Sequence, residues 1–230
     1  MKKIFIAAIA ALAMTACGSK QAQPVEAEPV EEAAAEVEFI RLNVPVKVEA
    51  AKVETTVDLA KQLIEASLKD NGVMEYDMYK SLTRPDYLLI YETWKDQPSL
   101  DAHSAADHFT TLVPKIQEQG EMVIEQFVKV AGQEMEGESI RINCHIVPND
   151  PAQKEAVVKL AKELVAGTQK DAGMVEYDLL ESVTRPNQLM IYETWMDQAS
   201  LDAHGQAEHF TTLLPQIKEL ATVNADKFKK

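Results

Sequence analysis

Histidine and tryptophan recur at one spacing in the two halves of this 230-residue chain. His103 follows Trp94 by nine residues, and His204 follows Trp195 by the same nine. A neutral imidazole has a pKa near ambient pH and can take the proton of a phenolic hydroxyl, while an indole can form the flat wall of an aromatic pocket. The pattern predicts two copies of a site in which a histidine base deprotonates an aromatic substrate that packs against the tryptophan.

Each of these residues also has a structural interpretation. His103 or His204 could hydrogen-bond a neighbouring strand and hold its helix in place. A large aromatic residue at the end of a strand, such as Trp94 or Trp195, often belongs to the core. The residue types alone leave both interpretations open.

Two carboxylates next to the tryptophans extend the candidate substrate-binding set. Glu92 and Glu193 lie on an otherwise apolar row of a strand. An enclosed carboxylate would have a raised pKa and could act as a base. At the rim of the sheet it would instead form a salt bridge, for example to Arg41 or Arg141.

Tyr76 and Tyr177 complete the polar candidates, as donors to a substrate oxygen or as core residues with satisfied hydroxyls. No metal site is expected, because His108 follows His103 by five residues, which places the two imidazoles about 140° apart on one continuous helix. His209 has the same relation to His204. Cys144 stands alone in its domain and is expected to be a small core residue.

All these residues lie in a duplicated stretch. Residues 72–116 and 173–217 align without a gap at an offset of 101, and 29 of the 45 positions are identical. A period of this length is too long for a solenoid unit, so it indicates two whole domains of about 95 residues each.

Within each copy the hydrophobic periodicity predicts the order strand, helix, strand, strand, helix, strand. In the first copy these elements are expected at 39–46, 51–70, 76–81, 88–94, from about residue 99, and 121–131. The strand at 88–94 is apolar on both faces, so we expect helices on one side and a partner sheet on the other. The sequence therefore predicts two ferredoxin-like α+β domains forming an intrachain dimeric α/β barrel.

The remaining segments are connectors and ends. Domain 1 is expected at 39–131 and domain 2 at 139–230, with a polar linker at 132–138. The last strand of domain 2 lies in the polar stretch 220–230, where we expect a short or frayed strand or a helix extension.

The N-terminus resembles that of a bacterial lipoprotein. Residues 1–16 have a basic start and a short apolar run, as in a signal peptide, and Cys17 is the expected lipidation site. Residues 17–38 form an acidic tether with few large apolar side chains. We expect a lipid-anchored protein of the cell envelope, with the outer membrane favoured because Asp does not follow Cys17. The net charge of −14 argues against nucleic acid as a partner.

The motif set as a whole resembles the antibiotic biosynthesis monooxygenase (ABM) family, most closely its quinol monooxygenase branch. The stretches that carry the resemblance are 75–77, 84–85, 91–94, 100–103 and 108–109, each with its counterpart 101 residues later. The resemblance implies one barrel built from two domains, here within one chain. It also implies oxygenation of a quinol or polyphenol without metal or flavin, so no cofactor is expected.

A haem-degrading branch of the same family carries an Asn in its first strand, where this chain has Asn43 and Asn143. On that basis both are included as substrate-binding candidates. That branch also needs a Trp and a His at positions that align with His103 and Val113, so haem degradation is not expected. Two other functions stay open, namely a non-catalytic envelope lipoprotein that binds an aromatic ligand and a purely structural protein.

Overall fold

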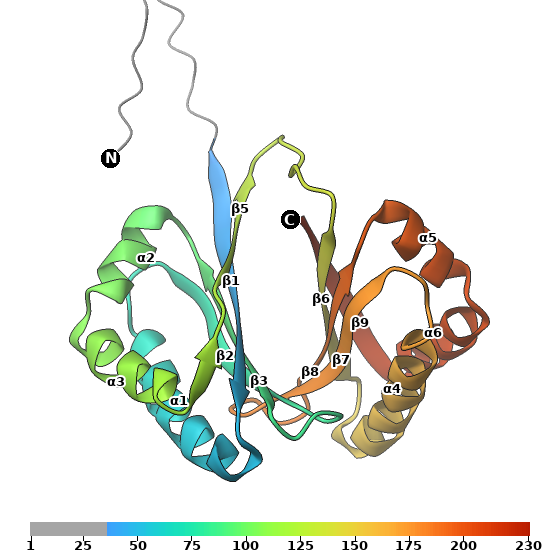
Figure 1. The fold of residues 1–230 in the computed structure, drawn as a ribbon, viewed down its shortest axis with the longest axis horizontal. Coiled ribbons are helices and arrows are strands. Elements are labelled where there is room, and N and C mark those ends of the chain that lie inside the picture. Colours follow the sequence, from blue (N-terminus) through green and yellow to red (C-terminus); the bar gives the residue numbers. More distant parts are fainter. Residues whose placement is uncertain (1–35) are drawn as a thin grey trace, which may run out of the picture. The chain divides into compact units, whose positions relative to one another are not determined.

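The two sequence repeats fold into two α+β domains of the same topology (Figure 1). The computed structural model describes residues 36–230; the expected signal peptide, Cys17 and the tether up to residue 35 lie outside the described residues. Domain 1 contains β1 (Val37–Val48), η1 (Ala50–Lys52), α1 (Val53–Ser67), β2 (Val73–Ser81), β3 (Tyr87–Trp94), α2 (Gln97–Ser104), α3 (Asp107–Gln117), β4 (Gly120–Met122) and β5 (Glu125–Val130). Domain 2 contains β6 (Ile140–Pro148), η2 (Pro151–Gln153), α4 (Lys154–Thr168), β7 (Met174–Ser182), β8 (Leu189–Trp195), α5 (Gln198–Gln206), α6 (Glu208–Leu220) and β9 (Ala221–Lys229).

The element order agrees with the prediction, and small differences follow from local contacts. The first strand begins at Val37, two residues before the expected start. The first helix ends at Ser67, three residues before the expected end at residue 70, and Leu68 just beyond it is 54% exposed. None of the helices within residues 36–230 is long and apolar enough to cross a membrane.

The expected helix after the tryptophan strand is two helices. Asp96 caps α2, because its carboxylate accepts a hydrogen bond from Ser99 N at 2.9 Å, and Pro98 lies in the first turn. The chain then leaves the helical conformation at Ala106, with φ −71° and ψ 149°, before α3 begins. This break changes the direction of His108, which follows it in α3.

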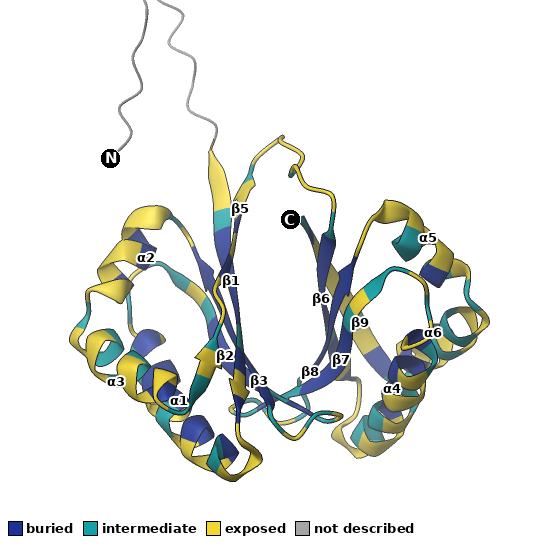
Figure 2. Ribbon diagram, viewed as in Figure 1, coloured by how far each residue is buried: buried dark blue, intermediate teal, exposed yellow. Residues whose placement is uncertain are grey.

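The two sheets are continuous through an antiparallel pairing of β2 with β7, which gives the strand order β4-β1-β3-β2-β7-β8-β6-β9, with β5 also paired to β1. Each sheet carries its own helices on the face turned away from the other sheet (Figure 1). Every residue of β3 and β8 is buried (Figure 2). The expectation that these strands are covered on both sides is confirmed.

Alternation along the strands separates two kinds of core. On β3, Leu88, Ile90 and Trp94 face the helices of domain 1. Tyr87, Leu89 and Tyr91 face a separate cluster shared with domain 2, whose members there are Leu180, Met190 and Tyr192. The first face can hold a cavity within one domain, and the second forms the domain interface.

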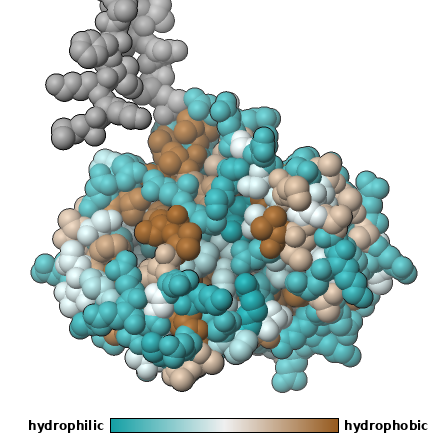
Figure 3. Space-filling view, in the orientation of Figure 1, coloured by the Kyte–Doolittle hydropathy of each residue, from teal (hydrophilic) through white to brown (hydrophobic). Residues whose placement is uncertain are grey.

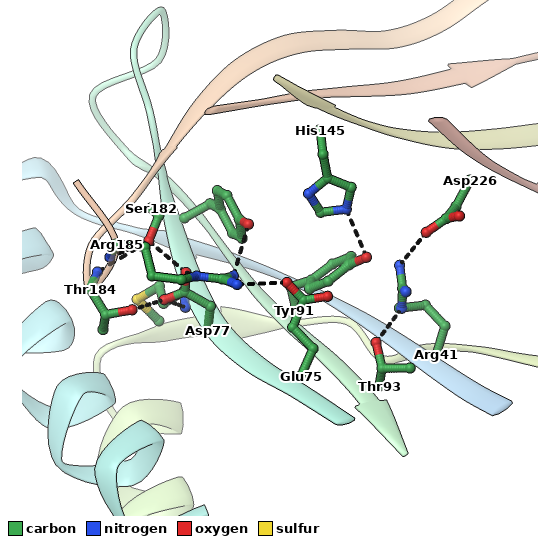
Figure 4. A network of polar contacts seen from close by, with 12 residues as sticks. Arg41, Glu75, Asp77, Tyr91, Thr93, His145, Ser182, Thr184, Arg185 and Asp226 are labelled. Atoms are coloured by element: carbon green, nitrogen blue, oxygen red, sulfur yellow. Dashed lines mark hydrogen bonds and ion pairs between the residues drawn. The ribbon is translucent and has the colours of Figure 1, made fainter. Parts of the chain in front are cut away.

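Ion pairs between buried carboxylates and partly exposed arginines reinforce that interface (Figure 4). Asp77 is fully buried and accepts hydrogen bonds from Ser182 Oγ at 2.5 Å, Thr184 Oγ1 at 2.6 Å and Arg185 Nε at 2.9 Å. Asp178 repeats the arrangement toward domain 1, accepting from Thr83 and from Arg84 Nε. Each domain therefore supplies the carboxylate for the other domain's arginine.

The last strands differ from expectation. In domain 2, β9 is a full strand paired with β6 from Ala221 to Lys229, so the expected fraying or helix extension is wrong. In domain 1 the corresponding strand is interrupted, because β4 ends at Met122 and β5 begins at Glu125. The polar composition of the second segment misled the prediction, since an edge strand can pair fully while its outer face is solvated.

Candidate functional site

Each domain contains a cavity between its sheet and its helices. The cavity of domain 1 has a volume of about 600 Å³, and that of domain 2 about 230 Å³. Tyr76 and Glu92 line the first, and Tyr177 and Glu193 line the second. A surface depression of about 720 Å³ also lies over α4, but it is lined mainly by lysine and glutamate side chains of that helix. We place the candidate sites in the two cavities between sheet and helices, where polar groups converge on an apolar lining.

Glu92 is the central polar group of the domain 1 cavity. It is 5% exposed, and its carboxylate accepts a hydrogen bond from Trp94 Nε1 at 2.8 Å. Burial raises the pKa of Glu92 to about 7, although the bond from Trp94 acts in the opposite direction. A group with this pKa exists in both protonation states near neutral pH, which suits a proton acceptor.

Glu193 reproduces this arrangement in domain 2. Trp195 Nε1 donates to it at 2.7 Å, and burial raises the pKa of Glu193 to about 7. The expected rim salt bridges are wrong for both carboxylates. Arg41 instead donates to Thr93 and pairs with Asp226 at 3.3 Å, and Arg141 pairs with Glu125 at 3.0 Å. Both arginines lie on the opposite, interface-facing row of their strands.

Trp94 and Trp195 are completely buried, and neither is among the residues lining its cavity. The structure favours the core interpretation over the pocket wall. Each indole nevertheless supports the site, because it holds the glutamate two residues before it on the same strand face.

Tyr76 and Tyr177 lie where a substrate-binding role requires. Both are nearly buried at the cavity wall, with 3% and 5% exposure. Burial, followed by the neighbouring carboxylate, raises the pKa of each phenol well above its usual value. Both hydroxyls therefore keep their protons and can donate a hydrogen bond to a substrate oxygen.

His103 is anchored by a carboxylate rather than by a strand. Its Nδ1 lies 2.7 Å from Asp70 Oδ2, and its ring packs against Trp94 at a tilt of 32°, with the centroids 4.5 Å apart. Nε2 is buried and has no partner among the described residues. Burial lowers the pKa of His103, so the ring is neutral and Nε2 is a free acceptor when Nδ1 carries the proton.

His204 has the same surroundings, with Nδ1 2.6 Å from Asp171 Oδ2 and Nε2 without a partner among the described residues. The two histidines differ in one respect. His204 is among the residues lining the domain 2 cavity, whereas His103 is not among those lining the larger cavity of domain 1. The two glutamates, unlike the histidines, line the cavity in both domains.

The second histidine of each pair approaches the same aspartate. His108 Nε2 lies 3.0 Å from Asp70 Oδ2, and the ligand atoms of Asp70, His103 and His108 are all within 4.8 Å of one another. The geometric reason for excluding a shared metal was wrong, because it assumed one continuous helix. Two imidazoles and a carboxylate can ligate a divalent metal. The same three groups recur in domain 2 as Asp171, His204 and His209.

Asn43 and Asn143 lie outside both cavities. Their side-chain amides hydrogen-bond each other across the domain interface, at 3.1 and 3.0 Å, and both residues are fully buried. The expectation that they bind substrate is corrected. Asn43 alternates with the cavity-lining Leu42 and Val44, and Asn143 alternates with the cavity-lining Ile142 and Cys144, so both face the other sheet.

Cys144 was predicted to be a core residue and not part of the site. It is buried with the apolar residues of domain 2, as expected, but it also lines that domain's cavity. Burial raises the pKa of Cys144 to about 12, so it is a neutral thiol and a poor nucleophile.

One signal in the sequence could have identified the buried glutamates. In the spacing Glu-x-Trp both side chains lie on one face of the strand, so the tryptophan N–H can donate a hydrogen bond to the carboxylate.

The raised pKa of Glu92 has a consequence for stability. The folded state binds more protons than the unfolded state between the ordinary pKa of 4.5 and the folded value of about 7, so the free energy of unfolding falls as pH rises through this window. Glutamine cannot ionise, so we expect Glu92→Gln to gain stability over the unsubstituted protein as pH rises. The difference in free energy of unfolding between variant and unsubstituted protein should change in favour of the variant by about 2–3 kcal/mol between pH 5 and pH 8. Urea unfolding at both pH values measures this difference.

Glu65→Gln is the matched control, because the Glu65 side chain is 81% exposed on α1. It should shift stability by less than about 0.5 kcal/mol at either pH. An equal effect of Glu92→Gln at pH 5 and pH 8 would contradict the raised pKa.

Comparison with known proteins agrees with this architecture. Residues 39–115 and 149–215 match the family model described as antibiotic biosynthesis monooxygenase. The Bacillus subtilis (strain 168) protein named "Putative monooxygenase YcnE" is 30% identical over 76 residues, which are 33% of this chain and 80% of that protein.

Two solved structures also match one domain each. A conserved protein of unknown function from Bacteroides thetaiotaomicron VPI-5482 is 42% identical, with 40% of this chain and 97% of that chain covered and a TM-score of 0.39. A conserved protein from Methanosarcina mazei Go1 is 36% identical, with 40% and 92% covered and a TM-score of 0.39. Because the family model matches more than half of the sequence, in one segment from each repeat, this chain belongs to the antibiotic biosynthesis monooxygenase family and carries two of its domains.

Proposed function

We propose that this protein is a monooxygenase that oxidises a quinol or related polyphenol with O₂ in the cavities of its two domains. The observation that carries the proposal is Glu92, a buried carboxylate at the wall of an apolar cavity with a pKa of about 7. Its repeat, Glu193, stands at the same place in domain 2. Family membership supports a monooxygenase-like activity, and the glutamate supports a phenolic substrate.

In the proposed reaction, Glu92 takes the proton of a substrate hydroxyl, while the neutral Tyr76 hydroxyl donates a hydrogen bond to a substrate oxygen. Removal of that proton raises the electron density of the ring, which favours electron transfer to O₂. A C–O bond then forms at a ring carbon and the O–O bond breaks. One oxygen atom stays on the product as a hydroxyl, and the other leaves as water with the two hydrogens lost when the quinol becomes a quinone. The substrate supplies both electrons that reduce the second oxygen atom.

His103 and His204 have a second role in the proposed reaction. Each presents a neutral Nε2 that has no hydrogen-bond partner within residues 36–230, and Asp70 or Asp171 holds the ring in orientation. Such a nitrogen can accept the proton passed on from the glutamate or accept a hydrogen bond from a second substrate hydroxyl. We assign the first proton transfer to the glutamates because, unlike the histidines, they line the cavity in both domains.

Oxygen uptake by the full chain, with a panel of reduced naphthoquinols and polyphenols, tests the proposal. We expect uptake above spontaneous autoxidation for at least one member of the panel. This excess should be lost in the folded Glu92→Gln/Glu193→Gln variant. Uptake that never exceeds the buffer blank would remove the oxygenase proposal and favour a ligand-binding role for the same cavities.

Metal removal distinguishes metal-free oxygenation from a reaction that depends on a metal held by Asp70, His103 and His108. Because the proposed substrate supplies its own electrons, dialysis against EDTA is expected to leave the rate of oxygen uptake within about twofold of the untreated rate. The rate of the treated enzyme, before and after addition of Fe²⁺, Mn²⁺ or Zn²⁺, checks this expectation. A loss of at least tenfold that one of these metals restores, and that His108→Ala/His209→Ala reproduces, would contradict it.

A further inference from the structure

The two cavities differ in size although their walls derive from one repeat. The domain 1 cavity measures about 600 Å³ and the domain 2 cavity about 230 Å³. Tyr76 and Glu92 are repeated as Tyr177 and Glu193, whereas Gln97, Asp101 and Gln126 line the domain 1 cavity and the residues at their positions do not line that of domain 2. The difference must therefore come from the remaining parts of the walls.

The backbone differs at one wall, the last strand. In domain 2, β9 pairs with β6 without interruption, and His145 is opposite Asn224. In domain 1 the ladder to β1 stops after the pair of Val46 with Met122 and resumes at the pair of Asn43 with Glu125. The gap lies where Pro45 takes the place of His145.

Proline explains why the ladder breaks there. Val123 N donates to Pro45 O at 3.1 Å, which is one of the two hydrogen bonds of an antiparallel pair. The second bond requires an N–H on residue 45, and proline has none. The segment between β4 and β5 is thus held by one bond where its counterpart in domain 2 has a continuous ladder.

This segment forms an apolar lip at the mouth of the domain 1 cavity. Ile124 lines the cavity and is 65% exposed, and the adjacent Val123 is 59% exposed. In the view of Figure 3, patches of apolar surface are visible on both halves of the molecule. The corresponding residues of domain 2 are Asn224 and Ala225. On the helix side of the cavity, Val113 of domain 1 is replaced by the longer Leu214 in domain 2.

We propose that Pro45 and the lip of Val123 and Ile124 make domain 1 the site for a bicyclic quinol with an apolar side chain, whereas the domain 2 cavity accepts only a single-ring phenol. A volume of about 600 Å³ lies within the usual range for small-molecule sites, and about 230 Å³ lies below it. An alkyl chain that leaves the cavity across Val123 and Ile124 would cover side chains that now face water. The quinol identity rests on the proposed function, but the difference between the domains does not.

The chain offers a direct way to measure each domain separately, because it contains two tryptophans, one beside each cavity. In Trp195→Phe the remaining fluorescence reports on an intact domain 1, and in Trp94→Phe it reports on an intact domain 2. The probes are a naphthoquinone with a ten-carbon alkyl chain and an unsubstituted benzoquinone. Quenching titrations of the full chain give a dissociation constant for each probe in each domain.

We expect the alkyl naphthoquinone to bind domain 1 at least about tenfold more tightly than domain 2. In the Trp195→Phe background, the substitutions Pro45→His, Val123→Asn and Ile124→Ala should together weaken this binding about tenfold. They should change benzoquinone binding by less than about threefold. Val113→Leu, which narrows the same cavity from α3, should also weaken the larger probe. Val128→Thr is the control, because Val128 is exposed on β5 but does not line the cavity.

Equal affinities of the two domains for the alkyl naphthoquinone would overturn the inference. So would unchanged binding in both the lip variant and Val113→Leu, with circular dichroism showing that each is folded. Domain-selective binding without oxygen consumption would support this inference while removing the proposed oxygenation, so the two failures are distinguishable.

Discussion

Replacing both cavity glutamates, Glu92→Gln and Glu193→Gln, is expected to lower kcat for quinol oxidation by about 10²–10⁴-fold. This is the range that general acid–base catalysis by one positioned side chain contributes. Glutamine keeps the acceptor for the tryptophan N–H but cannot take the substrate proton. Steady-state oxygen uptake gives kcat and KM for the double variant and for each single variant.

The dependence of kcat/KM on pH is a second measurement of the role of Glu92 and Glu193. The base must be ionised, and burial raises the pKa of Glu92 and Glu193 to about 7, so kcat/KM should increase as pH rises through 7. This increase should disappear in the double variant. Glu65→Gln, on the exposed face of α1, should retain both the rate and the profile. A double variant with an unchanged kcat would show that the glutamates are not the bases and would return that role to His103 and His204.

Replacing Asp77 with alanine is expected to destabilise the protein by about 3 kcal/mol. Asp77 is fully buried and accepts three hydrogen bonds from domain 2, including one from Arg185. Removing one partner of a buried ion pair costs about 3–5 kcal/mol, because the other charge loses its compensation. We take the lower end because the Arg185 side chain is 37% exposed and is partly screened by water.

Urea unfolding measures this loss, and Asp58→Ala on the exposed face of α1 is the control, with an expected change below about 0.5 kcal/mol. Asp77→Ala should also separate the unfolding of the two domains, because Asp77 joins β2 to the loop after β7. Equal stabilities of Asp77→Ala and Asp58→Ala would contradict the importance of this interface contact.

The domain organisation was predictable because the evidence for it is distributed over many residues. The repeat at an offset of 101, the two apolar faces of the strand at 88–94 and the turn residues between strands all indicate the same fold. The structure confirms the ferredoxin-like order and the partner sheet. A prediction supported by many weak signals does not fail when one of them, such as the end of the first helix, is misplaced.

The site was less predictable because it depends on single tertiary contacts. Ala105 and Ala106 are good helix formers, so no local signal indicates the break between α2 and α3. That break brings His108 to Asp70, a residue 38 positions earlier in the chain. Asn43 was assigned to substrate from a resemblance, whereas strand alternation places it at the interface with Asn143. The choice between a buried and a rim position for Glu92 required the position of Arg41.

The most direct test of the central claim is the fate of the oxygen atoms. The full chain would be supplied with ¹⁸O₂ and the most active naphthoquinol, and the product and water would be analysed by mass spectrometry. The account predicts one ¹⁸O atom in each hydroxylated quinone and one in water, with both signals at the autoxidation level in the Glu92→Gln/Glu193→Gln variant. An unlabelled quinone formed together with labelled hydrogen peroxide would contradict it, because the protein would then be an oxidase that inserts no oxygen.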